Sequence, residues 1–167
     1  DILDLTKIEH GSLDLHYQKL SVSELLRDCI ESFIPKSKDS GVEILWNVDK
    51  GVPDIIDGDL IRLKQIFLNI IGNAMKFTSK GHVKIDCAMK DKNFIEVKIS
   101  DTGIGISEEA IKNIFQPFSQ ADSSITQKYG GTGLGLTVSK MLIESFGGSL
   151  HVESVPEKGS TFTFTIP

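Results

Sequence analysis

The sequence predicts a domain that mixes helices and strands, and three features carry that prediction. Residues 59–77 repeat apolar side chains with the period of a helix. Residues 82–89 and 94–100 alternate apolar and polar side chains around a short polar turn, which is typical of an antiparallel hairpin. Residues 150–154 and 160–166 repeat that alternation around a second turn, so we expect two further strands.

Composition and charge narrow the class of protein. The chain has 167 residues and 40% hydrophobic content, which is enough for one well-buried core. Its formal net charge of −5 gives no electrostatic case for binding nucleic acid or an anionic membrane surface. It contains no membrane-spanning run and no leader pattern, so we expect a soluble fragment on the cytoplasmic side, even if the full-length parent is membrane-anchored. Cys29 and Cys87 lack a Cys-x-x-Cys partner, and we expect buried reduced thiols.

The N-terminal part of the chain predicts helices with a strand between them. Residues 1–9 carry an amphipathic helical pattern, and residues 13–17 alternate as a half-buried strand does. Ser21 with Glu24 three residues later is a capping-box pattern, which indicates the start of a second helix. Pro35 is unfavourable inside a helix, so we expect a kink or an early end there.

The helix over residues 59–77 is apolar around most of its circumference, so it should be largely buried. A buried polar group without a partner costs on the order of 1–3 kcal/mol, so any polar stripe on this helix must face something polar. For Arg62 we expect a structural partner, an acid in the preceding loop. The other members, two amides and an ammonium, suit a hydrated cation beside phosphate oxygens, although a face open to water is the alternative. The stripe spans roughly 60° of the helix and contains Arg62, Asn69, Asn73 and Lys76.

Asp101 stands at the end of the predicted hairpin and is followed by the glycine turn Thr-Gly-Ile-Gly-Ile. Its carboxylate could accept a hydrogen bond from an exocyclic amine, because the two glycines let the backbone approach a ligand closely. On this motif alone, a turn capped by Asp101 is the favoured interpretation. Ser107 then caps a short helix to about Asn113, and residues 116–129 form a long polar loop. Loops of that length are usually functional lids or disorder.

A second glycine run, Gly130-Gly-Thr-Gly-Leu-Gly135, precedes a further helical pattern. Glycines just before a helix expose consecutive backbone N–H groups beside the positive helix end, an arrangement that binds phosphate. No lysine follows as in P-loop proteins, and no strand precedes as in a dinucleotide fingerprint. Lys128 and Lys76 are nearby cations that could reach phosphates, although a lone lysine is more often a solvated surface charge.

Five short motifs, taken together and in this order, resemble the catalytic ATP-binding domain of the sensor histidine kinases. They match the N box, the first glycine box, the F box, the second glycine box and a final glycine motif of that family. The loop over residues 116–129 is most similar to that of hybrid kinases, which carry a receiver domain further along. Residues 1–11 are similar to the end of their dimerisation helix. In box order, the matching stretches are Asn69–Phe77, Asp101–Gly105, Phe115–Phe118, Gly131–Gly135 and Gly159–Phe162.

The resemblance implies the Bergerat (GHKL) ATP-binding fold. That fold is an α/β (α+β) two-layer sandwich, in which three main helices pack on one face of a mixed, mostly antiparallel sheet. Residues 1–10 would be the tail of the dimerisation and phosphoacceptor helix, and residues 11–167 the catalytic ATP-binding domain. A lid over about residues 116–132 would cover ATP against the central helix.

The resemblance also implies how the adenine end of ATP would be held. Asp101 would accept the adenine amine, helped by Thr161 through a shared water. Phe77 and Ile106 would pack against the ring. Further nucleotide contacts are implied for the positions that match the glycine boxes and the end of the lid: Gly103, Gly105, Lys128, Gly131, Thr132, Gly133, Leu134 and Gly135.

At the phosphate end the resemblance implies chemistry as well as binding. Asn73 would hold Mg²⁺, while Asn69 and Lys76, the implied catalytic residues, would act on that ion and the phosphates. The γ-phosphoryl of ATP would pass to a histidine, and positioning with charge neutralisation would do most of the catalysis. The implied partners are a histidine-bearing dimerisation domain of the same protein, in cis or in trans, and a downstream receiver domain, with a homodimeric parent.

Two departures from the family pattern matter. The phosphoacceptor motif, a histidine followed by glutamate, is absent from these residues, so we expect the chain to bind Mg-ATP without autophosphorylating alone. Gln127 stands where related sequences often carry arginine. One cation fewer near the phosphates predicts weaker affinity or a looser lid.

Two other functions stay open at this point. The same fold serves ATP hydrolases such as gyrase, mismatch-repair and chaperone ATPases. Those enzymes carry a general-base glutamate where this chain has Asn69, and an amide cannot take a proton from water. A degenerate kinase kept as a nucleotide-binding regulatory module would show eroded boxes, whereas only Gln127 departs here.

Overall fold

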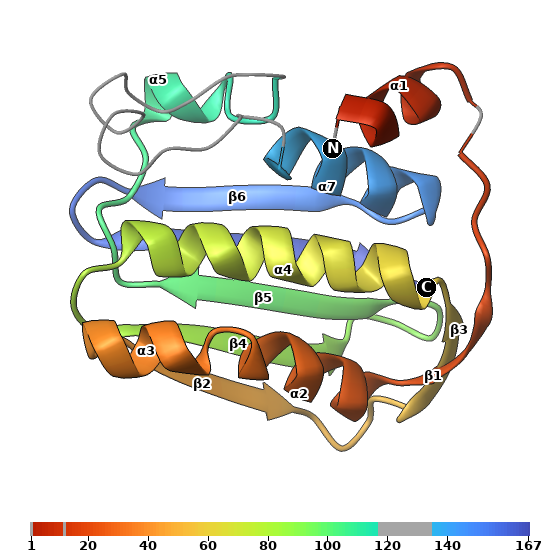
Figure 1. The fold of residues 1–167 in the computed structure, drawn as a ribbon, viewed down its shortest axis with the longest axis horizontal. Helices are drawn as coiled ribbons and strands as arrows, with labels where there is room; N and C mark the ends of the chain where they lie inside the picture. Colours follow the sequence, from red (N-terminus) through yellow and green to blue (C-terminus); the bar gives the residue numbers. More distant parts are fainter. Residues whose placement is uncertain (1, 12, 117–134) are drawn as a thin grey trace.

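The computed structural model describes residues 2–11, 13–116 and 135–167, and it confirms a two-layer α/β sandwich (Figure 1). The strands of its main sheet are β2 (Glu43–Val48), β4 (His82–Met89), β5 (Ile95–Asp101), β6 (Leu150–Val155) and β7 (Gly159–Ile166). Their order in the sheet is β2-β4-β5-β7-β6. The β2–β4 pair is parallel and the other neighbouring pairs are antiparallel, so the sheet is mixed and mostly antiparallel. No helix in the described ranges is long and apolar enough to cross a membrane.

Helices cover one face of this sheet (Figure 1). The main ones are α2 (Val22–Glu31), α4 (Leu60–Phe77) and α7 (Gly135–Ser145). The middle helix, α4, contacts both α2 and α7 and lies over β5. The ring of Phe67 on α4 packs edge-on against Phe164 of β7, with centroids 5.3 Å apart. Most of the apolar arc of α4 is therefore buried between two helices and the sheet, as its sequence predicts, but Ile61 in the first turn is 74% exposed.

The smaller elements differ in part from the sequence prediction. They are α1 (Ile2–Glu9), α3 (Ile34–Ser40), α5 (Glu108–Ile111) and an antiparallel pair, β1 (Gln18–Ser21) with β3 (Ile55–Gly58). Residues 13–17 were expected to form a strand but are irregular, because the strand begins where it meets β3, an element the sequence pattern missed. Pro35 lies in the first turn of α3, where its missing N–H needs no acceptor.

The start of α4 is fixed by two acids from different places. The Asp59 side chain caps the helix by accepting the backbone N–H of Arg62 at 3.2 Å. The Arg62 guanidinium instead donates to Asp4 on α1, where Nη1 and Oδ1 are 2.9 Å apart. The prediction of an acid in the preceding loop is therefore wrong for the Arg62 side chain. Gln65 donates to the other oxygen of Asp4 at 3.0 Å, which closes the cluster.

The two cysteines are core residues. Cys29 on α2 and Cys87 on β4 are buried and free, as predicted. Burial raises the pKa of Cys29 to about 11 and that of Cys87 to about 12. Neither thiol is a nucleophile at neutral pH, because the reactive thiolate is not populated.

Candidate functional site

The polar stripe of α4 faces α7 at Asn69. Its Nδ2 atom lies 3.3 Å from the carbonyl oxygen of Gly135 and 3.3 Å from Oγ of Ser139, and it donates to both. Asn73, one turn further along α4, is half-buried, and its amide forms no hydrogen bond with any residue that the structure describes. A half-buried amide that the protein leaves unsatisfied is available to a ligand.

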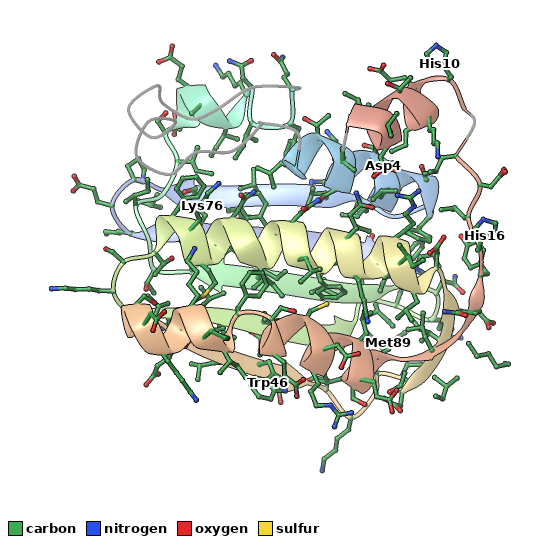
Figure 2. The ribbon with its side chains drawn as sticks, in the orientation of Figure 1. Asp4, His10, His16, Trp46, Lys76 and Met89 are labelled. Atoms are coloured by element: carbon green, nitrogen blue, oxygen red, sulfur yellow. The ribbon has the colours of Figure 1, made fainter. Side chains whose placement is uncertain are left out.

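The C-terminal end of α4 carries the remaining predicted residues of this helix. Lys76 is half-buried, and Figure 2 shows it toward the end of α4 that lies away from Asp4. Phe77 is the last residue of α4, and its carbonyl oxygen accepts the N–H of Ile104 at 3.2 Å. This hydrogen bond ties the helix end to the glycine turn after β5.

Asp101 is the last residue of β5 and is half-buried. Its Oδ1 atom accepts the backbone N–H of Gly103 at 2.9 Å and that of Ser160 at 3.3 Å. Burial raises the pKa of this carboxyl above its ordinary value, although the two N–H groups act against that rise. The Oδ2 atom accepts no hydrogen bond from the described part of the chain. One oxygen therefore fixes the carboxylate while the other remains an acceptor in a partly desolvated position, where a hydrogen bond is strong.

The two glycines of this turn allow close backbone packing. A Cβ at Gly103 would collide with the carbonyl group of Phe77 and would lie 2.9 Å from Oγ1 of Thr78. Gly105 has φ +72°, and a Cβ there would collide with the carbonyl group of Val155. A side chain at either position would push the turn away from α4 or from β6, and Asp101 with it.

Thr161 does not share a face of the sheet with Asp101. Asp101 pairs across the ladder with Ser160, and Thr161 pairs with Ser100. Successive side chains on a strand point to opposite faces, and Oγ1 of Thr161 donates to Oγ of Ser100 at 3.1 Å on the face away from the helices. In the described residues the direct hydrogen bond to Asp101 from this strand comes from the backbone N–H of Ser160, and the role of Thr161 stays a prediction. Alternation along the strand carries this signal, because Phe162, two residues after Ser160, is buried in the core on the same face.

Ser160 and Ser154, which the sequence reasoning missed, brace the glycine turn from the far side. Their Oγ atoms are 2.8 Å apart, and Oγ of Ser154 accepts the N–H of Ile106 at 2.7 Å. Ile106 is half-buried and packs against the hydrophobic core. Both ends of the turn, Asp101 and Ile106, are thus held by one pair of neighbouring serines.

The other predicted contacts fall mostly outside the described residues. Gly135 is the first residue of α7, so its N–H has no acceptor within the helix. Its carbonyl oxygen, as noted, accepts from Asn69. Nearly all of the predicted lid lies outside the described residues. So do five of the predicted nucleotide contacts: Lys128, Gly131, Thr132, Gly133 and Leu134.

Comparison with known protein families covers the whole of this site. Residues 58–167 match the sequence profile of the family described as histidine kinase-, DNA gyrase B- and HSP90-like ATPases. The chain belongs to this family. The matched range contains the polar stripe of α4, the glycine turn and the serine pair. The whole candidate site therefore lies within the segment that matches the family.

Individual relatives within the family are histidine kinases. Hybrid signal transduction histidine kinase L of Dictyostelium discoideum is 42% identical over 168 residues, which are 98% of this chain and 10% of that kinase. Signal transduction histidine-protein kinase BarA of Escherichia coli K12 is 41% identical over 170 residues, which are 99% of this chain and 18% of that kinase. The chain thus spans between a tenth and a fifth of the length of these relatives.

A solved structure confirms the fold assignment. The crystal structure of full-length ShkA in complex with AMPPNP aligns with a TM-score of 0.88 at 32% sequence identity. The alignment covers 99% of this chain and 34% of the ShkA chain. The chain therefore has the GHKL sandwich of a histidine kinase catalytic domain.

Proposed function

We propose that this domain binds Mg-ATP and transfers the γ-phosphoryl group to a histidine on a separate dimerisation domain, as the catalytic domain of a hybrid sensor histidine kinase. Similarity to histidine kinases over almost the whole chain supports the proposal. The observation that carries it is the amide at position 69, because the surroundings of that residue suit an amide and not a base.

Position 69 separates a kinase from a hydrolase in this family. A hydrolase needs a carboxylate here to take a proton from water. The carbonyl oxygen of Gly135 lies 3.3 Å from Nδ2 of Asn69 and can only accept. A carboxylate at position 69 would place an oxygen against that carbonyl, whereas an amide donates to it. This contact favours phosphoryl transfer to a partner over transfer to water.

The open oxygen of Asp101 is the proposed acceptor for the adenine amine. Oδ1 is already bound to two backbone N–H groups, so the carboxylate has a fixed orientation. Ser160 takes the supporting role expected of Thr161, because it lies on the same face of the sheet as Asp101. Phe77 and Ile106 would pack against the ring from the two sides of the glycine turn.

Asn73 and Lys76 are the proposed ligands of the phosphate end. The amide oxygen of Asn73 is the hard type of ligand that Mg²⁺ takes, and the described residues leave that amide unsatisfied. When bound, Mg²⁺ would neutralise charge on the phosphate oxygens. Lys76 adds a positive charge from the next turn of α4. The N–H groups of Gly131, Gly133 and Gly135 would complete the phosphate contacts.

The domain boundaries and partners are part of the same proposal. Residues 1–10 would end the dimerisation helix, residues 11–167 would form the catalytic domain, and residues 116–132 its lid. The partners would be the histidine-bearing dimerisation domain of the same protein, in cis or in trans, and a downstream receiver domain, in a homodimeric parent. Dependence on ATP supports a position on the cytoplasmic side.

Phosphoryl transfer in trans tests the proposal. The chain is mixed with separately produced dimerisation domains and ATP labelled on its γ-phosphate, and acid-labile label is measured on each protein. We expect label on a cognate dimerisation domain, none on this chain alone, and none when Asn73→Ala replaces the chain. Steady release of phosphate without transfer would favour a GHKL hydrolase, and absence of nucleotide binding would favour a degenerate regulatory module.

A further inference from the structure

Ser139 on α7 is a fully buried hydroxyl that contacts the proposed ATP site through Asn69. Its side chain has 0% exposure, and its Oγ lies 3.3 Å from Nδ2 of Asn69 on α4. Gly135, one turn earlier on α7, presents its carbonyl oxygen to the same nitrogen at 3.3 Å. A single amide therefore joins the middle of α4 to the first turns of α7.

These two contacts decide which way the Asn69 amide points. A backbone carbonyl accepts and never donates, so the side of the amide that faces Gly135 must be its nitrogen. The hydroxyl of Ser139 then accepts from that nitrogen too. Both donors of the amide are directed at α7, and Oδ1 is left as the group that can act on a ligand.

Gly135 places no side chain beside that oxygen. A Cβ at Gly135 would lie 3.7 Å from Cγ and 3.8 Å from Oδ1 of Asn69, in ordinary van der Waals contact with the amide. The start of α7 therefore supplies both the acceptor that orients the amide and the space beside it.

The packing between α4 and α7 does not itself call for a hydroxyl at position 139. On α7, Val138, Leu142 and Ile143 are fully buried and apolar, whereas the other buried hydroxyl nearby, Thr137, donates to the carbonyl oxygen of Phe115. A buried hydroxyl is disfavoured beside apolar side chains unless it is hydrogen-bonded, so alanine would satisfy the packing alone. The hydrogen bond with Asn69 explains the hydroxyl at position 139, whereas packing alone does not.

We infer that Ser139 is a positioning residue for the ATP site, which holds the Asn69 amide so that its oxygen is presented to the Mg²⁺ end of ATP. The inference rests on the proposed function and adds a residue to it. Ser139 does not touch the nucleotide in this account. Its whole effect passes through Asn69, and that restriction makes the inference testable by a double-mutant cycle.

The experiment titrates the whole chain with a fluorescent ATP analogue, once with Mg²⁺ and once with a chelator. We expect Ser139→Ala to raise the Kd measured with Mg²⁺ by about three- to tenfold, because one anchoring hydrogen bond is lost. The Kd measured without Mg²⁺ should stay unchanged. Ser145→Ala is the control for removing a hydroxyl from α7 away from Asn69, because the exposed Ser145 donates to the carbonyl oxygen of Met141 on its own helix at 2.8 Å.

The cycle with Asn69→Ala separates positioning from structure. Ser139→Ala should have no further effect on the Kd in the Asn69→Ala background. An equal loss in both backgrounds, or an unchanged Kd in the Ser139→Ala chain, would overturn the inference. Ser139→Cys, a second variant with a weak acceptor, should repeat the loss if the alanine variant folds poorly. If the unaltered chain binds no nucleotide, the proposed function fails, and the inference fails with it.

Discussion

Asp4 and Asp101 are half-buried carboxylates with different surroundings. Asp4 binds Arg62 in the first turn of α4 (Figure 2), whereas the glycine turn after Asp101 is bonded to Phe77 at the last residue of that helix. Both oxygens of Asp4 are occupied, one by Arg62 at 2.9 Å and the other by Gln65 at 3.0 Å. Only one oxygen of Asp101 is occupied by the residues that the structure describes. The first carboxylate is satisfied by the protein, and the second is held in place with an acceptor left over.

The pKa shifts of the two groups follow this difference. Burial raises the pKa of Asp101, and two backbone N–H groups do not cancel the rise. Burial would also raise the pKa of Asp4, but the hydrogen bonds from Gln65 and Arg62, with the charge of Arg62, bring it below its ordinary value. A closed polar cluster therefore stabilises the fold, whereas an incompletely bonded group is costly in the apo protein and suited to a ligand.

The largest expected effect is on nucleotide binding, and it comes from substituting Asp101, the carboxylate with an unoccupied acceptor. Asp101→Asn replaces the free acceptor by an amide donor while the other oxygen can still accept from Gly103. We expect the Kd for Mg-ATP to rise roughly 10- to 100-fold, because a hydrogen bond to a charged group is lost. Titration with a fluorescent ATP analogue measures this. Asp86→Asn, on the neighbouring strand, should bind like the original chain, and an unchanged Kd for Asp101→Asn would contradict the assignment.

A smaller effect, on stability and not on binding, should follow from substituting Asp4, whose two oxygens bind Arg62 and Gln65. Asp4→Asn removes the counter-charge of Arg62 and turns a donor toward Gln65. We expect the free energy of unfolding in urea to fall by about 1–3 kcal/mol, because half-buried Arg62 loses its counter-charge and half-buried Gln65 loses its acceptor. Circular dichroism follows the transition. A midpoint equal to that of the original chain would show that the cluster contributes nothing.

The pH dependence of stability should separate the two carboxylates by sign. Asp4 has a lowered folded pKa, so the stability it provides is present above the ordinary value of 3.8 and is lost as the pH falls through the folded pKa. Asp101 has a raised folded pKa, so its contribution is present below 3.8 and is lost as the pH rises through the folded pKa. Asp4→Asn should therefore be less stable than the original chain at neutral pH, and Asp101→Asn should not. Urea midpoints from pH 3 to 7 measure both, and shifts of the same sign would contradict the account.

The smallest effect should come from an exposed ion pair. Nζ of Lys64 lies 3.5 Å from Oδ2 of Asp28, with both side chains more than a third exposed. Asp28→Asn should change the free energy of unfolding by about 0.5 kcal/mol or less, because solvent screens the pair. A loss as large as that of Asp4→Asn would show that burial of the Asp4 cluster is not what matters.

The sequence was informative where a pattern is local. The sequence analysis predicts the hairpin of β4 and β5 from local alternation, and the structure contains it. The partner of Arg62 lies 58 residues away on α1, and no local pattern encodes that contact. Likewise β1 begins where β3 pairs with it, which is a fact of tertiary structure.

Within the site, the motif located the segment, and the structure adds that Ser160, next to the predicted Thr161, is the residue paired with Asp101. Asp101 faces Ser160 because of the ladder register, and a one-residue slip moves a side chain to the other face. Ser139 was not a candidate at all, because its importance depends on the approach of α7 to Asn69. The sequence motifs therefore identified the segments of the candidate site. The neighbouring residues that contact them could be identified only from the tertiary structure.

Unfolding with and without Mg-ATP, measured on Asp4→Asn and Asp101→Asn, tests the central claim most directly. At a hundredfold excess over Kd, a ligand stabilises the folded state by about 2.7 kcal/mol. We predict that Asp4→Asn lowers the stability of the apo protein and keeps this ligand-induced gain, whereas Asp101→Asn keeps the apo stability and loses about half of the gain or more. A full gain in Asp101→Asn, or its loss in Asp4→Asn, would contradict the account.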